Sequence, residues 1–285
     1  MIKASVVIPV YNNPDGLKKV LASLVKQEFP KNEYEIIVVD NGSTDDTLDI
    51  AKTFTKNFPD LVQHFVENKI KSSYAARNTG IKVAKGNVIA FTDSDCIPDK
   101  NWLIEGYKSL IQNDVSMVAG KIKFTFNNSN PNIWEYFDAA GKLNQKSYVE
   151  NTGFGATANL FVLKRMFDKY GLFLSDLKSG GDYEFGRRLT QSGEVLLYEE
   201  NSLVFHTARS GFRSKLAKSR RIAEGQRILA EMDLLDHGKL DLKQLLLTKY
   251  YPSLSEIKLK INEKIMLVLI NNFFRYYNFF KRIKL

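Results

Sequence analysis

Two aspartates separated by one residue, Asp93 and Asp95, form the most chemically suggestive pair in the sequence. They follow the apolar run Asn87–Thr92, which is typical of a buried strand. In an extended segment, residues i and i+2 point to the same side, so we expect the two carboxylates to face one way. Carboxylates suit Mg²⁺ or Mn²⁺, whose shell is completed by phosphate oxygens and water. The pair therefore predicts a metal site, or alternatively a solvated loop or helix cap.

Polar residues also follow two other apolar runs. Tyr11 comes directly after Ser5–Val10, and Asp40 comes directly after Glu35–Val39. If these runs are parallel strands, their carboxyl ends share one edge of a sheet, where ligands bind in such folds. The Asp40 carboxylate is suited to accept a nucleobase N–H or to bond a ribose hydroxyl. The alternative is that it caps the turn that follows.

Stretches with helical spacing separate the apolar runs and define the fold class. Apolar periodicity predicts helices over Asp15–Gln27, Ser72–Ala84 and Asp99–Gln112, with a further helix running to about Lys56. Strands alternating with helices predict an α/β fold, in which a mostly parallel sheet has right-handed crossovers and helices on its faces. Further strands are expected over Val62–Glu67 and Val115–Phe126.

Three more groups have side chains suited to catalysis or binding. Arg77 lies in one of the predicted helices and suits a phosphate or a base carbonyl, unless it is an ordinary surface arginine. Asp182 and Glu184 lie in a glycine-rich segment, where a carboxylate within reach of an acceptor hydroxyl would serve as a general base. His206 follows an apolar run and is either a structural residue or a metal ligand beside Asp95.

Composition excludes several classes of protein. The 285 residues are 44% apolar and 26% charged, which is typical of globular chains and not of disordered or collagen-like ones. At about 150 residues per domain, the chain allows one large domain or two small ones. A single cysteine, Cys96, excludes an internal disulfide and a four-cysteine zinc site, and favours a reducing compartment. Because Pro9 interrupts Ser5–Val10, this short run predicts a strand and not a signal peptide.

The net charge of +9 comes from the C-terminal part of the chain. Residues 207–285 contain 17 Lys or Arg and 7 Asp or Glu, whereas residues 1–206 contain 24 and 25. Helices are predicted here over Arg209–Met232 and Leu234–Leu254. A basic segment of this kind suits nucleic acid, anionic lipid headgroups or phosphorylated substrates, or is simply a solvated face.

The C-terminal segment 264–285 combines an apolar run with aromatic and basic residues. Its uninterrupted apolar run is six residues long, whereas a membrane-spanning helix needs about 20. Aromatic residues interleaved with Arg and Lys suit a helix that lies in a membrane interface. The alternative is an amphipathic helix packed on the domain or on a second subunit in a homodimer.

The segments that carry these residues resemble the family 2 glycosyltransferases, which have the GT-A fold. The resemblance implies a GT-A domain over residues 1–206, with a nucleotide-sugar half over about 1–125 and an acceptor and catalytic half over about 126–206. Residues 207–285 lie outside it and are predicted to be a helical basic extension. The matching segments are Ser5–Asn12, Ile36–Asp45, Ala76–Gly80 and Asp93–Asp95, with weaker matches at Gly155–Asn159 and Gly180–Leu189.

The resemblance implies an inverting enzyme of the hexosyltransferase class that uses a nucleotide-sugar, with UDP as the default nucleotide. Asp40 would then bind the nucleobase, while Asp93 and Ser94 would face the ribose or the diphosphate. The nucleotide pocket would also be lined by Pro9, Tyr11 and Arg77.

The resemblance also implies a metal and a base. Asp95, together with His206, would hold Mn²⁺ or Mg²⁺ on the diphosphate. Asp182 would be the catalytic base, with Glu184 as the second choice. The family has a Glu-Asp pair at this point, whereas this chain has Gly181 in place of the Glu.

We expect the acceptor to be a glycan or a lipid-linked glycan of cell-envelope polysaccharide synthesis. The enzyme would be cytoplasmic, with peripheral contact to the cytoplasmic face of the membrane through residues 264–285. Two other functions compete with this one. A nucleotidyltransferase would need a Gly-rich basic N-terminal loop, which Tyr11–Pro14 does not provide. A non-catalytic basic module on a degenerate transferase fold would bind nucleic acid or membrane, but four intact acids argue against it, and no specific nucleic-acid partner is expected.

Overall fold

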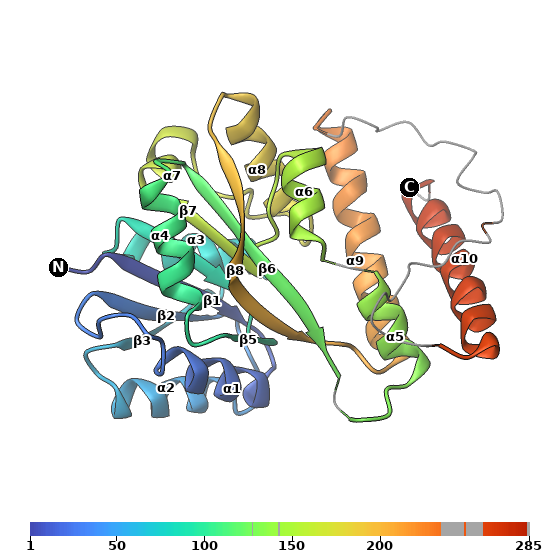
Figure 1. Cartoon of the computed structure of the whole chain (residues 1–285), viewed down its shortest axis with the longest axis horizontal. Helices are drawn as coiled ribbons and strands as arrows, with labels where there is room; N and C mark the ends of the chain where they lie inside the picture. The colour runs from blue at the N-terminus through green and yellow to red at the C-terminus, as the bar shows by residue number, and fades with distance from the viewer. Residues whose placement is uncertain (127, 142, 235–247, 249–258, 284–285) are drawn as a thin grey trace. The chain divides into compact units, whose positions relative to one another are not determined.

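The computed structural model describes residues 1–126, 128–141, 143–234, 248 and 259–283 (Figure 1). The chain forms two compact units. Unit 1 consists of Met1–Lys123, Asn144–Leu177 and Gly181–His206, and unit 2 consists of Phe124–Leu143, Lys178–Gly180 and Thr207–Leu285.

A sheet with the strand order β3-β2-β1-β4-β7-β6-β8-β5 forms the centre of unit 1. The strands β1, β2, β3 and β4 pair in parallel, whereas the pairs β4–β7, β7–β6 and β8–β5 are antiparallel. The predicted α/β class is confirmed, with the parallel pairs grouped at one side of the sheet. The strands are β1 (Ala4–Val10), β2 (Tyr34–Asp40), β3 (Val62–Val66), β4 (Val88–Thr92), β5 (Cys96–Pro98), β6 (Met117–Thr125), β7 (Asn159–Leu163) and β8 (Leu196–Thr207).

The strands β1 and β2 are buried at all seven of their positions. Such strands are apolar almost throughout, because helices cover both faces of a parallel sheet. The fit is close: a Cβ atom at Gly80 in α3 (Ser73–Val83) would lie 2.5 Å from the Val7 side chain of β1. Glycine at this position therefore lets α3 approach the sheet.

The predicted helices of unit 1 are confirmed to within about one turn. Asn13 caps α1 (Pro14–Leu24) by accepting a hydrogen bond from the Gly16 N–H, and Ser72 caps α3 through the Tyr74 N–H. These caps satisfy backbone donors that a helix leaves unpaired at its N-terminus. The other helices of unit 1 are α2 (Thr47–Asn57), α4 (Trp102–Gln112), α6 (Gln145–Thr152), α7 (Arg165–Tyr170) and α8 (Gly181–Gln191).

The described helices of unit 2 are α5 (Ile133–Ala140), α9 (Phe212–Glu231) and α10 (Ile261–Ile283). Its core contains Phe137 of α5 and three residues of α10, which are Leu267, Ile270 and Phe274. The predicted helix over Arg209–Met232 is confirmed as α9. The helix predicted over Leu234–Leu254 falls almost wholly outside the described residues. Among the helices that the structure does describe, none combines the length and the apolar character needed to cross a membrane.

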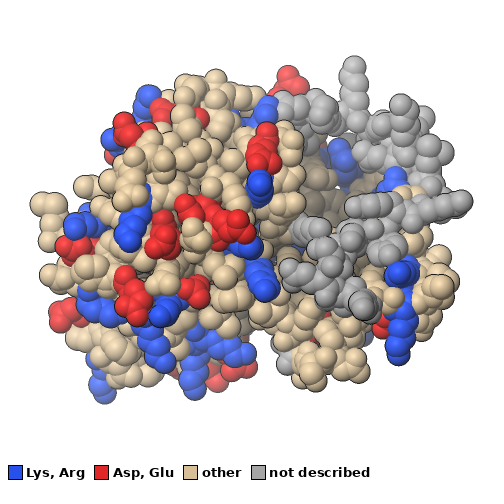
Figure 2. Space-filling model, in the orientation of Figure 1, with Lys and Arg blue, Asp and Glu red and all other residues tan. Residues whose placement is uncertain are grey.

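Charged side chains are distributed unevenly between the two parts of the chain. On the face shown in Figure 2, Lys and Arg are interspersed with Asp and Glu over unit 1, in agreement with its nearly balanced sequence. In unit 2, α9 alone contains six Lys or Arg and two Glu. Interspersed charges produce little net field, whereas an excess of one sign attracts the opposite charge.

Candidate functional site

The candidate site lies in unit 1, where the parallel strands β1, β2 and β4 end. Because β1 lies between β2 and β4 in the sheet, the residues at their carboxyl ends share one edge. Tyr11 follows β1, Asp40 is the last residue of β2, and Asp93 follows β4. The structure therefore brings together polar residues that are separated by up to 82 positions in the sequence.

The Asp40 carboxylate is buried and only half satisfied. Its Oδ2 atom accepts hydrogen bonds from the backbone N–H groups of Gly42, at 3.1 Å, and Ser43, at 3.0 Å. Its Oδ1 atom is buried and has no hydrogen-bond partner among the described residues. Buried polar atoms are nearly always hydrogen-bonded, so an unpartnered one at a strand end indicates a place for a ligand donor. The turn thus orients the carboxylate and leaves one oxygen for a ligand.

The loops that follow β1 and β2 hold each other in place. The Asn12 N–H donates to Ser43 Oγ at 2.9 Å, and the Thr44 N–H donates to Asn12 Oδ1 at 2.8 Å. Asn12 has a φ of 47°, a left-handed conformation that asparagine tolerates better than most residues. These reciprocal bonds fix the two loops on either side of the edge.

Three further residues predicted to bind the nucleotide-sugar, Pro9, Tyr11 and Ser94, lie in different environments. Pro9 is buried within β1, opposite Val39 of β2. Tyr11 is exposed, and the Lys71 Nζ atom lies 6.0 Å from the centre of its ring. Ser94 Oγ accepts a hydrogen bond from Asn13 Nδ2 at 3.1 Å, which links the loop after β4 to the start of α1. Of these three, Tyr11 is the side chain with most surface for a ligand.

An ion pair between Arg77 and Asp93 connects α3 to the residue that follows β4. Arg77 of α3 donates from Nη2 to Asp93 Oδ1 at 2.5 Å, and its side chain is only 4% exposed. The guanidinium also lies 5.3 Å from the centre of the Tyr74 ring. Its Nε atom is buried without a hydrogen-bond partner among the described residues. Arg77 is therefore not a surface arginine, and it retains a donor for a further anion.

Asp95, Cys96 and His206 form a cluster of potential metal ligands, with ligand atoms within 4.8 Å of one another. Antiparallel pairing of β5 with β8 sets Cys96 opposite His206, and His206 Nε2 lies 3.6 Å from Asp95 Oδ2. Burial, with added repulsion from the carboxylates of Asp95 and Asp93, raises the pKa of the Cys96 thiol well above its usual value. In the metal-free protein the thiol is therefore protonated, and the carboxylate and the imidazole are the donors that we consider for a cation. This donor set suits a divalent cation, although its imidazole is a less favourable ligand for Mg²⁺, which prefers oxygen.

The Asp182 carboxylate, in the first turn of α8, is held by two donors. The Tyr74 hydroxyl donates to Asp182 Oδ1 at 3.0 Å, and the Tyr183 N–H donates to the same atom at 3.0 Å. Burial, assisted by the charge of Asp182, raises the pKa of Tyr74 far above its ordinary value of 10.0. Tyr74 therefore stays protonated and acts as a fixed donor across the accessible pH range.

A steric constraint accounts for the glycine at position 181, where the family has the Glu of its Glu-Asp pair. A Cβ atom at Gly181 would lie 2.9 Å from three carbons of the Tyr74 ring. The ring therefore occupies the space into which a side chain at position 181 would begin to grow, and any larger residue would displace it. Sequence reasoning missed Tyr74, because no local pattern links two residues 108 positions apart.

Glu184 is engaged elsewhere in α8. Its two carboxylate oxygens accept hydrogen bonds from Arg188, from Nε at 2.7 Å and from Nη2 at 2.9 Å. Arg188 in turn donates to the carbonyl oxygens of Tyr170 and Leu172. This bidentate pair, one turn apart on the helix, ties α8 to the segment after α7.

Comparisons with known proteins identify the family of the chain. The family described as "Glycosyl transferase family 2" matches residues 5–171. A relative named glycosyltransferase AglE, from Haloferax volcanii, is 36% identical over 222 residues, which are 78% of this chain and 72% of the relative.

Two solved structures resemble the whole chain. The mannosyltransferase PcManGT from Pyrobaculum calidifontis was solved with GDP-Man and Mn²⁺ and matches this chain with a TM-score of 0.64 at 15% identity. The matched region covers 99% of this chain and 73% of the PcManGT chain. Residues 1–349 of TarS from S. aureus, solved with UDP-GlcNAc, match this chain with a TM-score of 0.62 at 22% identity. Here the matched region covers 98% of this chain and 73% of the TarS chain. At these identities the likeness shows a shared GT-A fold. The family match and the AglE relative show that the chain belongs to glycosyl transferase family 2 and is a glycosyltransferase.

Proposed function

We propose that the chain transfers a sugar, with inversion, from a nucleotide-sugar to a hydroxyl group of a glycan or lipid-linked acceptor. The observation that carries this proposal is a complementary pair of buried atoms that have no hydrogen-bond partner in the described part of the chain, Asp40 Oδ1 and Arg77 Nε. One is an acceptor for a base N–H and the other a donor for a phosphate or base carbonyl. A nucleotide presents the matching groups.

Two carboxylates of the donor site would bind different parts of the nucleotide. Asp40 would accept a hydrogen bond from the nucleobase, because its free oxygen is oriented by the Gly42 and Ser43 N–H groups. Asp93 would bind the ribose hydroxyls while it balances the charge of Arg77. A buried guanidinium without a partner is strongly destabilising, so Asp93 has a structural role in addition.

Asp95 and His206 would hold the divalent metal, for which Mn²⁺ is our choice from the carboxylate–imidazole donor set. A metal bound there would stabilise the charge that develops on the departing diphosphate. The PcManGT structure, solved with Mn²⁺, supports this choice through its shared fold.

Asp182 would act as the general base. Its carboxylate would accept the proton of the acceptor hydroxyl as the hydroxyl oxygen forms a bond to the anomeric carbon, while the bond from that carbon to the nucleoside diphosphate breaks. A single displacement from the opposite face inverts the anomeric centre. We favour Asp182 over Glu184, because both oxygens of Glu184 are occupied by Arg188. Tyr74 would be the positioning residue that orients the base.

UDP remains the default nucleotide, although the two structural neighbours contain UDP-GlcNAc and GDP-Man. We propose a cell-envelope glycan or lipid-linked glycan as the acceptor, reached at the cytoplasmic face of the membrane. The contact would be made by α10, which exposes Ile265, Leu269 and Phe273 at intervals of four residues. This spacing places the three side chains on one face of the helix, and Lys281 and Arg282 follow in its last turn.

Substituting the base tests the mechanism. Asp182→Asn is expected to lower kcat by about 10²–10⁴-fold, as loss of a general base does, with donor binding unchanged. Tyr74→Phe is expected to lower kcat by about tenfold and to move the acid limb of the rate profile to higher pH, because the ionised carboxylate loses a donor. The measurement is nucleoside diphosphate release from a panel of nucleotide-sugars across pH.

The matched control is Tyr170→Phe, which removes a 2.7 Å tyrosine–carboxylate hydrogen bond to Glu194, away from the proposed base. Its rate profile should keep the wild-type shape. Full transfer activity in Asp182→Asn would show that Asp182 is not the general base. An unchanged pH profile of the rate in Tyr74→Phe would show that Tyr74 contributes packing alone.

The metal assignment predicts a selective loss of Mn²⁺ binding. Asp95→Ala and His206→Gln are each expected to weaken Mn²⁺ binding in the presence of UDP or GDP by at least about tenfold, because each removes one ligand. Electron paramagnetic resonance of free Mn²⁺ measures this directly. Asp49→Ala, which removes an exposed carboxylate of α2, is the control. Wild-type Mn²⁺ affinity in both site variants would contradict the assignment.

The membrane proposal predicts that vesicle binding depends on the exposed face of α10. A variant with Ile265→Ser, Leu269→Ser and Phe273→Ser should lose flotation with phosphatidylglycerol–phosphatidylcholine vesicles, because each apolar side chain contributes about 1.5–3 kcal/mol when buried. The control replaces Val66, Ile111 and Val195, which are exposed in unit 1, by serine. If the wild type forms a dimer that the α10 variant loses, and neither binds vesicles, the face serves a homodimer instead.

A further inference from the structure

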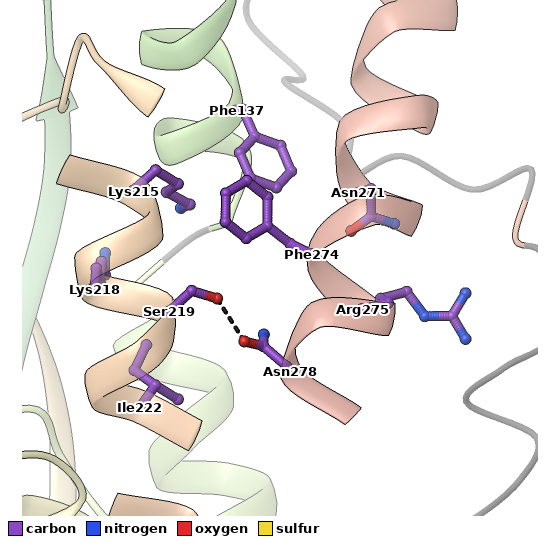
Figure 3. A pocket seen from close by; sticks show the side chains of 9 residues that line it. All are labelled: Phe137, Lys215, Lys218, Ser219, Ile222, Asn271, Phe274, Arg275 and Asn278. Carbon is purple, nitrogen blue, oxygen red and sulfur yellow. Dashed lines mark hydrogen bonds between the residues drawn. The ribbon is translucent and has the colours of Figure 1, made fainter. Parts of the chain in front are cut away.

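A cavity of about 190 Å³ lies within unit 2, among the helices α5, α9 and α10 (Figure 3). A space of roughly 10–15 Å³ is enough for one water molecule, so this cavity accommodates a group of several atoms. It lies among residues that the transferase mechanism does not use. Its lining combines apolar walls with cationic side chains, which is unusual for an internal packing defect.

The cationic side is formed by Lys215 and Lys218, one turn apart on α9. Both ammonium groups contact the same carboxylate oxygen, Asp138 Oδ1, at 2.8 Å and 3.3 Å. The Asp138 side chain is fully buried, whereas the side chains of Lys215 and Lys218 are 14% and 19% exposed. Arg209 also lies 3.5 Å from Asp138 Oδ2, so three cations contact one carboxylate and positive charge is in excess around it.

The pKa values of Lys218 and Asp138 agree with an excess of positive charge around the Asp138 carboxylate. Burial lowers the pKa of Lys218 to about 8, although the neighbouring Asp138 opposes this shift. Burial would by itself raise the pKa of Asp138, but Lys218, Lys215 and Arg209 outweigh it and hold that pKa well below its ordinary value of 3.8. Lys218 is thus protonated at neutral pH, although its cationic form is destabilised by poor hydration.

Two aromatic rings also line the cavity. Phe137 and Phe274 stack with their ring centres 5.5 Å apart, and the Lys215 Nζ atom lies 4.7 Å from the centre of the Phe137 ring. In Figure 3 both rings lie beside the Lys215 side chain, while Ser219 donates to Asn278 Oδ1 at 2.5 Å across the space between α9 and α10. The cavity thus presents cations and hydroxyl or amide groups next to apolar carbon.

We propose that this cavity binds a phosphate group, carried either by a lipid or by a small soluble compound. A phosphate oxygen anion supplies the charge that Lys215 and Lys218 lack, and it accepts charge-assisted hydrogen bonds from both ammonium groups. The excess of positive charge in residues 207–285 attracts such an anion to unit 2. The inference does not depend on the chemistry assigned to the transferase site.

Calorimetric titration of the full chain with three probes tests the proposal. An alkyl phosphate below its micelle-forming concentration and inorganic phosphate carry the anion, whereas an alkyl glucoside of the same chain length does not. We expect the alkyl phosphate to bind, and the glucoside to bind at least about tenfold more weakly. Stronger binding of the alkyl phosphate than of inorganic phosphate assigns the ligand to a lipid, and equal binding assigns it to a soluble phosphate. Binding of neither phosphate overturns the proposal.

Variants locate the site. Lys218→Gln should weaken phosphate binding by about tenfold, while Lys215 and Arg209 still balance Asp138. Arg220→Gln changes the charge equally on the same helix but at an exposed position, and should leave the affinity unchanged. Equal effects of the two variants would show that only general charge attraction is at work, and would overturn the proposal.

A second measurement uses the unaltered protein and so does not depend on the folding of a variant. Lysines are acetylated with a trace of reagent, with and without saturating alkyl phosphate, and the modified peptides are quantified by mass spectrometry. Labelling of Lys215 and Lys218 should fall severalfold, while that of Lys52, exposed in unit 1, stays constant. Unchanged labelling of both α9 lysines would contradict a ligand in this cavity.

Discussion

The ion pair between Arg77 and Asp93 is the interaction around which the candidate site is organised. Arg77 is nearly inaccessible to solvent, so its charge requires a fixed anion, and Asp93 supplies one directly after β4. Tyr74, one turn earlier in α3, lies against the guanidinium and donates to Asp182. A single helix therefore connects the strand-end carboxylate on the proposed donor side with the carboxylate that we propose as the base.

The position of α3 is in turn fixed by hydrogen bonds at its N-terminus and at its middle. Ser72 donates from its hydroxyl to the Leu177 carbonyl oxygen at 2.7 Å, and Asn78 donates to the Phe173 carbonyl oxygen at 2.8 Å. On the sheet side, Gly80 permits close contact with Val7. Rigid supports of this kind matter for a transferase, because a small displacement of a catalytic group costs much of the rate.

The sequence is informative about the first half of unit 1 for a physical reason. Buried parallel strands must be apolar throughout, and the polar residues after them must lie at the ligand edge, so local patterns suffice to place Asp40 and Asp93. The contacts that complete the site are non-local. The Tyr74–Asp182 hydrogen bond spans 108 positions, and the pairing of Cys96 with His206 depends on how β5 meets β8.

Burial also decided points that residue type left open. The sequence alone was equally compatible with Arg77 at the surface, and only the burial of its side chain and its contact with Asp93 distinguish the two cases. Glu184 matched the base as well as Asp182 did by chemistry, but its pairing with Arg188 is visible only in the folded helix. In unit 2, the excess of basic residues was evident, whereas the concentration of two lysines on the buried Asp138 was not.

The central claim is that the strand-end carboxylates form a nucleotide-sugar donor site. Calorimetric titration with UDP, GDP, CDP and dTDP, with and without Mn²⁺, tests it on the wild type and on Asp40→Asn, which replaces the unpartnered oxygen or its neighbour by an amide donor. The account predicts that one nucleoside diphosphate binds in the presence of Mn²⁺ and that Asp40→Asn weakens its binding at least about tenfold. Failure of the folded wild type to bind any of the four, or unchanged affinity in Asp40→Asn, would contradict the account.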